Sequence, residues 1–151
     1  MIAVIQRVSS ASVKVDGALV GKCGHGLCIL LGVAKEDTAE DADALVRKIL
    51  NLRIFEDDAG KMNRSLLDVG GEMLVISNFT LLAAYKKGNR PDYMGAAAPA
   101  EANKLYEYFA DKCAELVPVQ KGIFGADMKV DIANDGPVTI VMDSRVLLGK
   151  A

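Results

Sequence analysis

The chain has 151 residues and a formal net charge of −2, and 51% of its residues are hydrophobic. This length is enough for one domain with a sizeable core, and this composition excludes an intrinsically disordered chain. The slightly acidic balance argues against a protein that coats nucleic acid by charge alone, although a local basic patch could still make transient contact.

The N-terminal part of the chain predicts antiparallel strands. Residues 2–9 alternate and are rich in β-branched side chains, and two further runs, 11–15 and 18–23, flank Asp16-Gly17. An Asp-Gly pair between alternating runs favours a type I′ hairpin turn, in which both central residues have positive φ. Because the apolar run 27–33 predicts one more strand, we expect an antiparallel meander.

The next part of the chain predicts one helix and one short strand. Residues 37–51 carry apolar side chains at helical spacing. Asp37 or Thr38 can cap this helix, and Glu40 stands three residues after Asp37, as in a capping box. Residues 52–56 predict a short strand, which a turn rich in aspartate and glycine ends.

The stretch 72–82 combines a buried strand with a polar motif. Its continuous apolar run, 73–76, is typical of a strand that is covered on both faces. Ser77, Asn78 and Thr80 then interrupt the apolar pattern, and a buried polar group without a partner costs roughly 1–3 kcal/mol. Either a local bend supplies hydrogen-bond partners, or the strand opens onto a pocket at this point.

A long loop over residues 83–99 follows the polar motif. Long loops without regular structure are uncommon in compact domains and are often functional. Lys86, Lys87 and Arg90 place three positive charges on this loop, which suits contacts with phosphate groups. The alternative is a solvated loop whose lysines aid solubility.

A second helix is predicted over residues 100–117, and Pro118 stops it. One side of this helix is apolar, which predicts that it packs on the sheet. The apolar residues at helical spacing are Leu105, Phe109, Cys113 and Leu116.

The C-terminal part predicts two more strands, 128–133 and 138–142. Residues 134–137, Asn-Asp-Gly-Pro, favour a tight turn between them. Proline cannot donate a backbone hydrogen bond, so it belongs at a strand start or edge. From the residues alone, Gly136-Pro137 is expected to form part of the turn, with the ordinary trans peptide bond.

These elements predict one α+β domain over residues 1–151. We expect a mostly antiparallel sheet curled toward a barrel, with two main helices packed on it. Residues 61–71 carry no clear signal for an element, and the tail 145–151 is open to disorder. There is no internal repeat and no linker that would divide the chain.

Cysteine and histidine usage narrows the class of protein further. Cys23, Cys28 and Cys113 form no C-x-x-C pair, and His25 is the only histidine, so we expect no disulfide framework, no metal site and no cofactor. No apolar run reaches the roughly 18–20 residues of a membrane span, and the opening residues lack the features of a signal peptide. The expected location is the cytoplasm, without a membrane partner.

Two motifs, Ser77–Leu81 and Asn134–Thr139, resemble the two signature motifs of the D-aminoacyl-tRNA deacylase family. The resemblance runs in order over nearly the whole chain, to about residue 144. One departure is Asn78, which stands where the family's motif more often carries glutamine, an amide with a longer reach. The further segments that look like this family are 3–8, 49–55, 87–91 and 124–128.

The resemblance implies a homodimer whose active site lies at the subunit interface and binds the aminoacylated 3′ end of tRNA. One subunit would hold the terminal adenosine and the aminoacyl group, and a Gly-Pro peptide, cis in this family, would enter from the other subunit. Lys86, Lys87 and Arg90 are our own inference for tRNA contact. The implied catalytic residues are Ser77, Phe79 and Thr80, and the implied substrate-binding residues are Asn78, Met128, Gly136, Pro137 and Arg7, the last as a brace for the Gly-Pro segment.

The implied reaction is hydrolysis of the ester that joins a D-amino acid to the ribose of tRNA. A Ser-His-Asp triad is disfavoured, because His25 is distant in sequence from both motifs and no Gly-x-Ser-x-Gly elbow exists. Thr80 could act as a nucleophile but has no evident base, so we favour a role in positioning the ester. Backbone N–H groups around Phe79 and Thr80 could stabilise the oxyanion, while the ribose 2′-hydroxyl helps to activate water.

Main-chain atoms of the Gly-Pro segment could provide the chiral selection. A wall facing the substrate Cα would exclude an L side chain, admit D-amino acids, and let glycine through, including glycine mischarged on the alanine tRNA. Two other functions are open: a metal-free hydrolase or isomerase of small molecules, and an RNA-binding module without activity. The acidic total and the lack of an aromatic-rich basic face count against the second.

Overall fold

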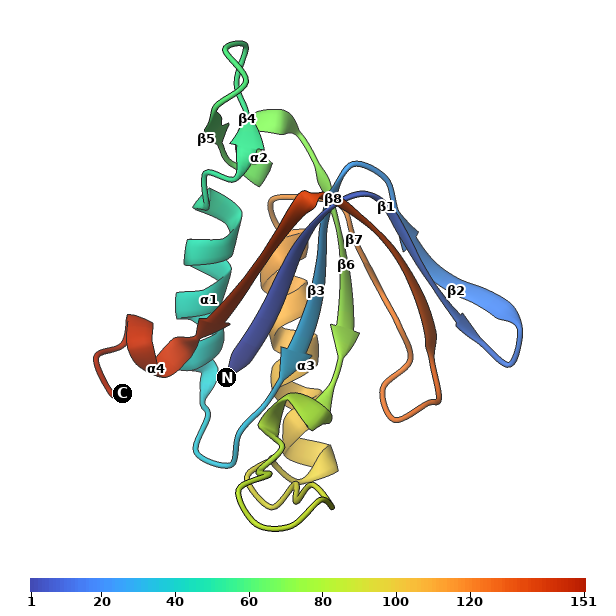
Figure 1. Ribbon diagram of the computed structural model, residues 1–151, viewed down its shortest axis with the longest axis vertical. Helices are drawn as coiled ribbons and strands as arrows, with labels where there is room; N and C mark the ends of the chain where they lie inside the picture. The colour runs from blue at the N-terminus through green and yellow to red at the C-terminus, as the bar shows by residue number, and fades with distance from the viewer.

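The long strand β1, Ile2–Val15, is the centre of a six-stranded sheet in the computed structural model, which describes all 151 residues (Figure 1). After the turn at Asp16-Gly17, β2 (Ala18–Cys23) pairs with the second half of β1 and β3 (Gly26–Gly32) with its first half. Both turn residues have positive φ, 49° and 78°, as predicted. The predicted meander is wrong, because β1 is long enough to pair with both strands in one extended hairpin.

The other edge of β3 continues the sheet in a different sense. Strand β6 (Glu72–Ser77) runs parallel to β3, and β7 (Val119–Lys121) runs parallel to β6. The sheet is therefore mixed, although its longest pairings are antiparallel. It curls until β2 approaches β7, where the backbone N–H of Lys22 donates to Oε1 of Gln120 at 2.8 Å. The predicted α+β class and the curl toward a barrel are confirmed.

The last strand, β8 (Lys129–Asp143), pairs antiparallel with β1 along nearly its whole length. The two separate strands and tight turn predicted here are wrong, because both halves of β8 run in one direction along the same partner. The register shifts between the pairs Val8↔Asn134 and Gln6↔Thr139, so the intervening residues form a bulge. The Gly136-Pro137 peptide bond within it is cis, as the family resemblance implied, so the trans bond expected from the residues alone is wrong.

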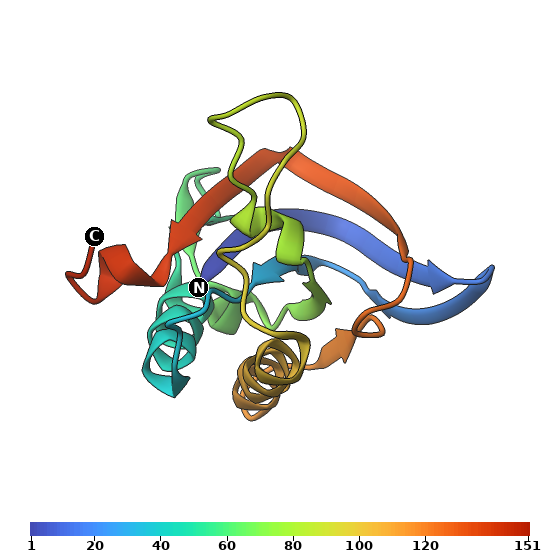
Figure 2. The ribbon, with the colours of Figure 1, turned by 90° about the horizontal axis from the view of Figure 1, so that it is seen from below.

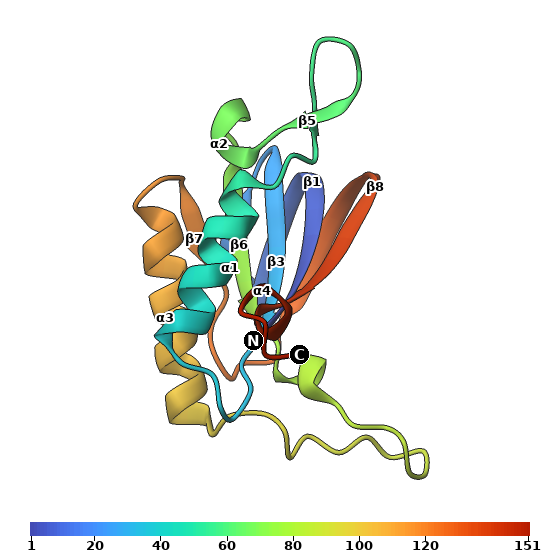
Figure 3. The same cartoon turned by 90° about the vertical axis from the view of Figure 1, so that its left-hand side faces the viewer.

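Two main helices, α1 (Ala39–Asn51) and α3 (Pro99–Ala114), lie side by side on one face of the sheet (Figures 1 and 3). None of the helices has the length and apolar composition that crossing a bilayer requires. The tail forms a helical turn that the pattern of residues did not signal, and Leu147 within it packs against the core. The short elements are β4 (Phe55–Glu56), β5 (Met62–Arg64), α2 (Leu66–Val69), the 3₁₀ helix η1 (Phe79–Leu82) and α4 (Ser144–Leu147).

Helix α1 is capped by a different carboxylate from the one predicted. Asp41, three residues after Thr38, accepts the backbone N–H of Thr38 at 2.9 Å, so Asp41 and not Glu40 completes the capping box. Asp37 does not cap the helix; its carboxylate accepts a hydrogen bond of 2.8 Å from the α-ammonium group of Met1. The capping box therefore counts from Thr38, one residue later than Asp37.

The main core lies between the helices and one face of the sheet. Phe109 and Cys113 of α3 are fully buried, as predicted. Leu116 is 63% exposed, because the helix ends at Ala114 before the stripe reaches it. Tyr106 is buried in its place, and its hydroxyl donates to the carbonyl oxygen of Val75 in β6 at 2.9 Å. Helix α3 is thus tied to the strand that carries the polar motif.

A second, smaller core fills the concave face of the curled sheet. Its seven buried residues come from β1, β2, β3 and β6, and partly buried side chains at the start of β8 pack against it. This core supports the sheet beside the motif without help from a helix. Its members are Val8, Ala11, Val13, Cys23, Cys28, Leu74 and Ile76.

Candidate active site

The polar motif lies where β6 ends and the chain turns into η1. The predicted strand over 72–82 is wrong beyond Ser77. The backbone N–H of Asn78 makes the last hydrogen bond to β3, to the Leu31 carbonyl oxygen at 2.8 Å, and the next residues coil into a 3₁₀ turn. Ser77, at the end of the strand, is half-buried, whereas Phe79 is 56% exposed. The change from strand to turn places four consecutive side chains at the rim of one cavity.

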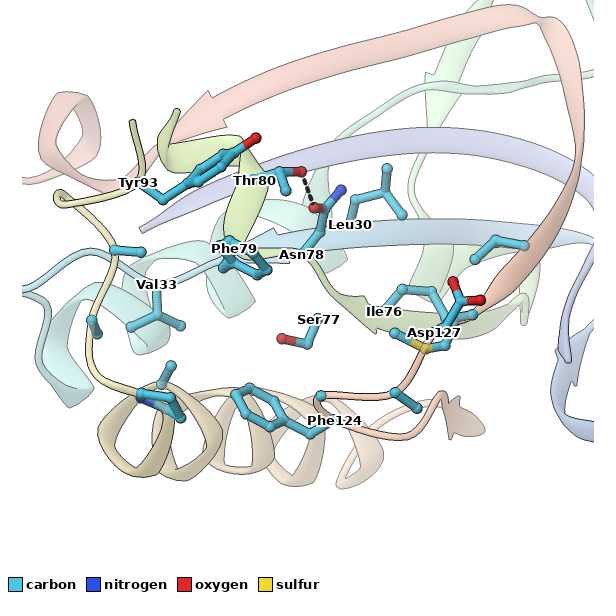
Figure 4. Close-up of a pocket in the computed structure, with 18 of the residues that line it drawn as sticks. Leu30, Val33, Ile76, Ser77, Asn78, Phe79, Thr80, Tyr93, Phe124 and Asp127 are labelled. Atoms are coloured by element: carbon cyan, nitrogen blue, oxygen red, sulfur yellow. Dashed lines mark hydrogen bonds between the residues drawn. The ribbon is translucent and has the colours of Figure 1, made fainter. Parts of the chain in front are cut away.

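This cavity, which we call the main pocket, has a volume of about 830 Å³ (Figure 4). Ser77, Asn78, Phe79 and Thr80 all line it, and Met128 lines it from the segment that precedes β8. Fourteen of its 20 lining residues are hydrophobic, so a bound group would make mostly apolar contacts there. The larger apolar side chains are Leu30, Val33, Ile76, Phe124, Val130 and Ile132.

The only hydrogen bond between side chains of the motif joins Thr80 to Asn78. The Thr80 hydroxyl donates to Oδ1 of Asn78 at 2.5 Å (Figure 4). An amide oxygen holds a proton far too weakly to act as a general base, so this contact orients Thr80 without activating it. Asn78, the one departure noted in the resemblance, thus has a defined partner within the motif.

The start of η1 leaves two backbone donors free. Leu81 N–H donates to the Asn78 carbonyl, but the N–H groups of Phe79 and Thr80 donate to no group of the chain. The first N–H groups of any helical turn lack partners within it. Beside an apolar pocket, two such donors are suited to a developing negative charge on an oxygen atom.

Aromatic contacts extend the rim of the main pocket into the long loop. The rings of Phe79 and Tyr93 meet edge to face, with centroids 5.1 Å apart. The sequence reasoning did not single out Tyr93, which lines the pocket from a loop where only the basic residues carried a signal. Phe124 was noted only within the segment 124–128 that looks like the family, and it packs against Tyr106 with ring centroids 6.1 Å apart.

The Gly-Pro segment and its brace lie outside the main pocket. Gly136 and Pro137 are exposed. Arg7 is 6% exposed and donates to the carbonyl oxygens of Asp135, at 3.2 Å, and Ile54, at 2.9 Å. It lines a separate cavity of about 210 Å³, to which the single histidine, His25, also belongs. Arg7 therefore contacts the main chain next to Gly136 and not the pocket that holds Ser77 and Thr80.

The basic residues of the long loop also lie outside the main pocket. Lys86, Lys87 and Arg90 are exposed, and none of them forms an ion pair or a hydrogen bond with another group of the chain. Backbone hydrogen bonds of 2.7 and 2.9 Å between Ala84 and Asp92 close the segment that carries them. Of the sequence-predicted site, the structure thus gathers Ser77 to Thr80 and Met128 in one pocket and leaves the other residues in two separate places.

Comparison with known proteins gives consistent results at the level of sequence. The sequence model of the family described as D-Tyr-tRNA(Tyr) deacylase matches residues 4–143. A D-aminoacyl-tRNA deacylase of Sulfurihydrogenibium sp. (strain YO3AOP1) is 58% identical over 147 residues, covering 97% of this chain and all of the relative. Another, of Geotalea uraniireducens (strain Rf4), is 59% identical over 145 residues, covering 95% of this chain and 94% of the relative.

Solved structures share the fold. A structure described as a c-Myc DNA unwinding element binding protein matches with a TM-score of 0.89 at 44% identity, covering 95% of this chain and 98% of that one. A probable eukaryotic D-amino acid tRNA deacylase matches with a TM-score of 0.82, covering 94% of this chain and 98% of that one. Because the second match is only 17% identical, it shows that the fold is shared and nothing more.

Proposed function

The chain belongs to the D-Tyr-tRNA(Tyr) deacylase family, and from this premise we propose that it hydrolyses the ester of D-aminoacyl-tRNA and releases a free D-amino acid and tRNA. The observation that carries the proposal is the main pocket, an apolar cavity lined by Phe79 and Thr80, the two residues whose backbone N–H groups have no partner within the chain. Its volume of about 830 Å³ suits a ligand with the size of a nucleoside bearing an aminoacyl group.

In the proposed mechanism the protein supplies position and charge stabilisation. The N–H groups of Phe79 and Thr80 donate to the ester carbonyl oxygen as it becomes an oxyanion. Thr80, fixed by its bond to Asn78, orients the ester and does not attack it. Water, activated with help from the neighbouring ribose 2′-hydroxyl, adds to the carbonyl carbon, and the ribose oxygen leaves with a proton.

The chiral selection is proposed to come from a second copy of the chain. Gly136 and Pro137 are exposed and lie outside the main pocket, so they are free to meet the main pocket of another subunit. Arg7 holds this segment through the Asp135 carbonyl. Main-chain atoms at the substrate Cα would collide with an L side chain but not with hydrogen, so D-aminoacyl and glycyl esters would both be cleaved.

The first experiment compares the release of D-tyrosine, L-tyrosine and glycine from matched aminoacyl-tRNAs with a metal chelator present. We expect rapid release of D-tyrosine and glycine, little release of L-tyrosine, and no effect of the chelator. Similar rates on the D and L esters would contradict the selection. Salt-insensitive turnover of a free ester would favour a small-molecule hydrolase, and tRNA binding without turnover would favour a binding module.

Two variants that are each first shown to be inactive alone test, when mixed, whether the site is shared between subunits. Phe79→Ala removes a ring from the main pocket, and Gly136→Ala adds a methyl group to the proposed wall, 3.0 Å from the Arg7 guanidinium. If subunits exchange freely in a two-fold dimer, mixing should restore roughly a quarter of the active sites. Thermal unfolding of each variant controls for misfolding, and mixed variants that stay inactive despite subunit exchange would place all site residues in one chain.

A further inference from the structure

The long loop carries, directly after the pairing of Ala84 with Asp92, an aromatic side chain that the proposed mechanism does not use. Tyr85 is 80% exposed, the highest value among the large hydrophobic side chains of the chain. The other tyrosines are covered to a greater extent: Tyr93 is 37% exposed at the pocket rim, and Tyr106 is 1% exposed. An aromatic ring that is almost wholly exposed to water indicates a binding surface for a partner.

Backbone pairing places Tyr85 close in the loop to a residue of the main pocket. Tyr85 directly follows Ala84, whose N–H and carbonyl groups both pair with Asp92. Asp92 in turn precedes Tyr93, which lines the pocket and contacts Phe79. One pair of backbone hydrogen bonds therefore joins the two parts of the loop that carry the exposed ring of Tyr85 and the pocket residue Tyr93.

The charge around Tyr85 indicates the chemistry of its partner. Residues 85–91 contain Lys86, Lys87 and Arg90 and no acidic residue, although the whole chain has a net charge of −2. All three cations are exposed and free of ion pairs within the chain. The segment projects beyond the sheet on the side away from α1 and α3 (Figures 2 and 3). Unpaired cations beside a free aromatic ring are the combination with which proteins bind single-stranded nucleic acid.

We propose that Tyr85 is a stacking platform for an unpaired nucleotide that precedes the terminal adenosine of the tRNA, while Lys86, Lys87 and Arg90 contact the adjoining phosphates. This inference rests on the proposed function and adds a specific RNA contact to it. Every nucleobase has a face on which a ring can stack, so the platform reads single-stranded RNA and not a particular base. It leaves the hydrolytic step to the main pocket.

The test compares three substitutions on two substrates. Tyr85→Ala removes the ring, Tyr85→Phe keeps it, and Tyr85→Leu keeps apolar surface without an aromatic plane. On D-tyrosyl-tRNA, we expect Tyr85→Ala and Tyr85→Leu to raise KM by about tenfold with little change in kcat, and Tyr85→Phe to resemble wild type. Leu19→Ala, an exposed position on β2, is the matched control and should leave KM unchanged.

The second substrate is D-tyrosyl adenosine, which lacks the preceding nucleotides. On this substrate the effect of Tyr85→Ala should disappear. An equal KM for Tyr85→Ala and wild type on the tRNA would overturn the inference, as would an equal loss on both substrates or full activity of Tyr85→Leu. If wild type cleaves neither substrate, the proposed function itself fails, and the two failures are thereby distinguished.

The salt dependence of RNA binding separates the contribution of the Tyr85 ring from that of the cations. For binding of an unpaired RNA oligonucleotide ending in the tRNA 3′ sequence, Lys87→Ala should lower the slope of log K against log salt by about 0.7, the value for one lost phosphate contact on a single strand. Tyr85→Ala should weaken binding without changing this slope. A change of slope with Tyr85→Ala would mean that the ring only positions the cations, and would contradict stacking.

Discussion

At the scale of single residues, Thr80 decides between two kinds of chemistry. Thr80→Val keeps the shape of the side chain and removes the hydrogen bond to Asn78. If Thr80 only orients the ester, kcat/KM should fall by about tenfold or less, which corresponds to one neutral hydrogen bond. If Thr80 is the nucleophile, the loss should reach several orders of magnitude. Rapid-quench assays decide, and a covalent aminoacyl adduct trapped with Thr80→Ser would contradict the positioning role.

A second residue-scale prediction concerns the support of the motif. Tyr106 donates to the Val75 carbonyl two residues before Ser77, and Gly122 N–H donates to the same oxygen at 3.3 Å. Burial, with a smaller contribution from the Glu107 carboxylate, raises the pKa of Tyr106, so its hydroxyl remains a neutral donor. Tyr106→Phe should lower the free energy of unfolding by about 1 kcal/mol. Urea titration measures this; an unchanged midpoint would mean that Gly122 alone satisfies the oxygen.

Sequence reasoning located the motif but not its whole surroundings. Ser77 to Thr80 are adjacent in the chain, so polar residues interrupting an apolar strand were enough to reveal them. Tyr93 and Phe124 join the same pocket from segments whose path depends on long-range contacts, such as the pairing of Ala84 with Asp92. No local pattern of residues encodes that pairing. Arg7 was recognised only by resemblance, because its partners are backbone carbonyls of distant segments.

At the scale of elements, the parallel pairing of β3 with β6 depends on a glycine. A Cβ atom on Gly26 would lie 1.9 Å from the carbonyl oxygen of Glu72, so the two strands would have to separate. We expect Gly26→Ala to lower the free energy of unfolding by about 1–3 kcal/mol, as overpacking does elsewhere. Gly95→Ala is the control, because its nearest atom would be 3.7 Å away. Equal unfolding midpoints for the two variants would contradict the expected clash.

The elements differ in how well their residues predict them. Helices α1 and α3 follow their 3.6-residue periodicity, so their existence was predicted and only their caps and ends were misplaced. The single strand β8 was not predicted, because Asn-Asp-Gly favours a bulge within one strand as readily as a hairpin turn between two. Both structures use positive φ, and Gly136 has φ of 126°. The choice is made by β1, which pairs with residues on both sides of the bulge.

At the scale of the whole molecule, acid should destabilise the fold. Burial opposes ionisation of Asp41, but hydrogen bonds from Ser144 and Thr38 and the nearby Met1 ammonium outweigh it and lower the pKa. A lowered folded-state pKa means that the unfolded chain binds the proton more tightly, so this stabilisation is complete above the ordinary aspartate value of about 3.9 and is lost below it. The other aspartates with a lowered pKa are Asp57, Asp68 and Asp143.

Urea unfolding at a series of pH values tests this expectation. The free energy of unfolding should be nearly constant from neutral pH to about pH 5 and should then fall steadily as the pH approaches 3. Asp41→Asn should be less stable than wild type at neutral pH and should show a shallower fall in acid. Parallel pH profiles for the two proteins would mean that Asp41 contributes nothing to the acid transition.

The pairing of β1 with β8 has a consequence for synthesis of the chain on the ribosome. The strand made first must wait for the strand made near the end, since Val4 pairs with Val141 and Val13 with Val130. At about 5–20 residues per second, one edge of β1 stays unpaired for roughly ten seconds after it emerges. Ribosome-bound chains stopped before residue 129 should therefore be cut by protease within β1, whereas chains released at full length should resist. A nascent chain of this protein is thus expected to depend on chaperones that cover a bare strand edge.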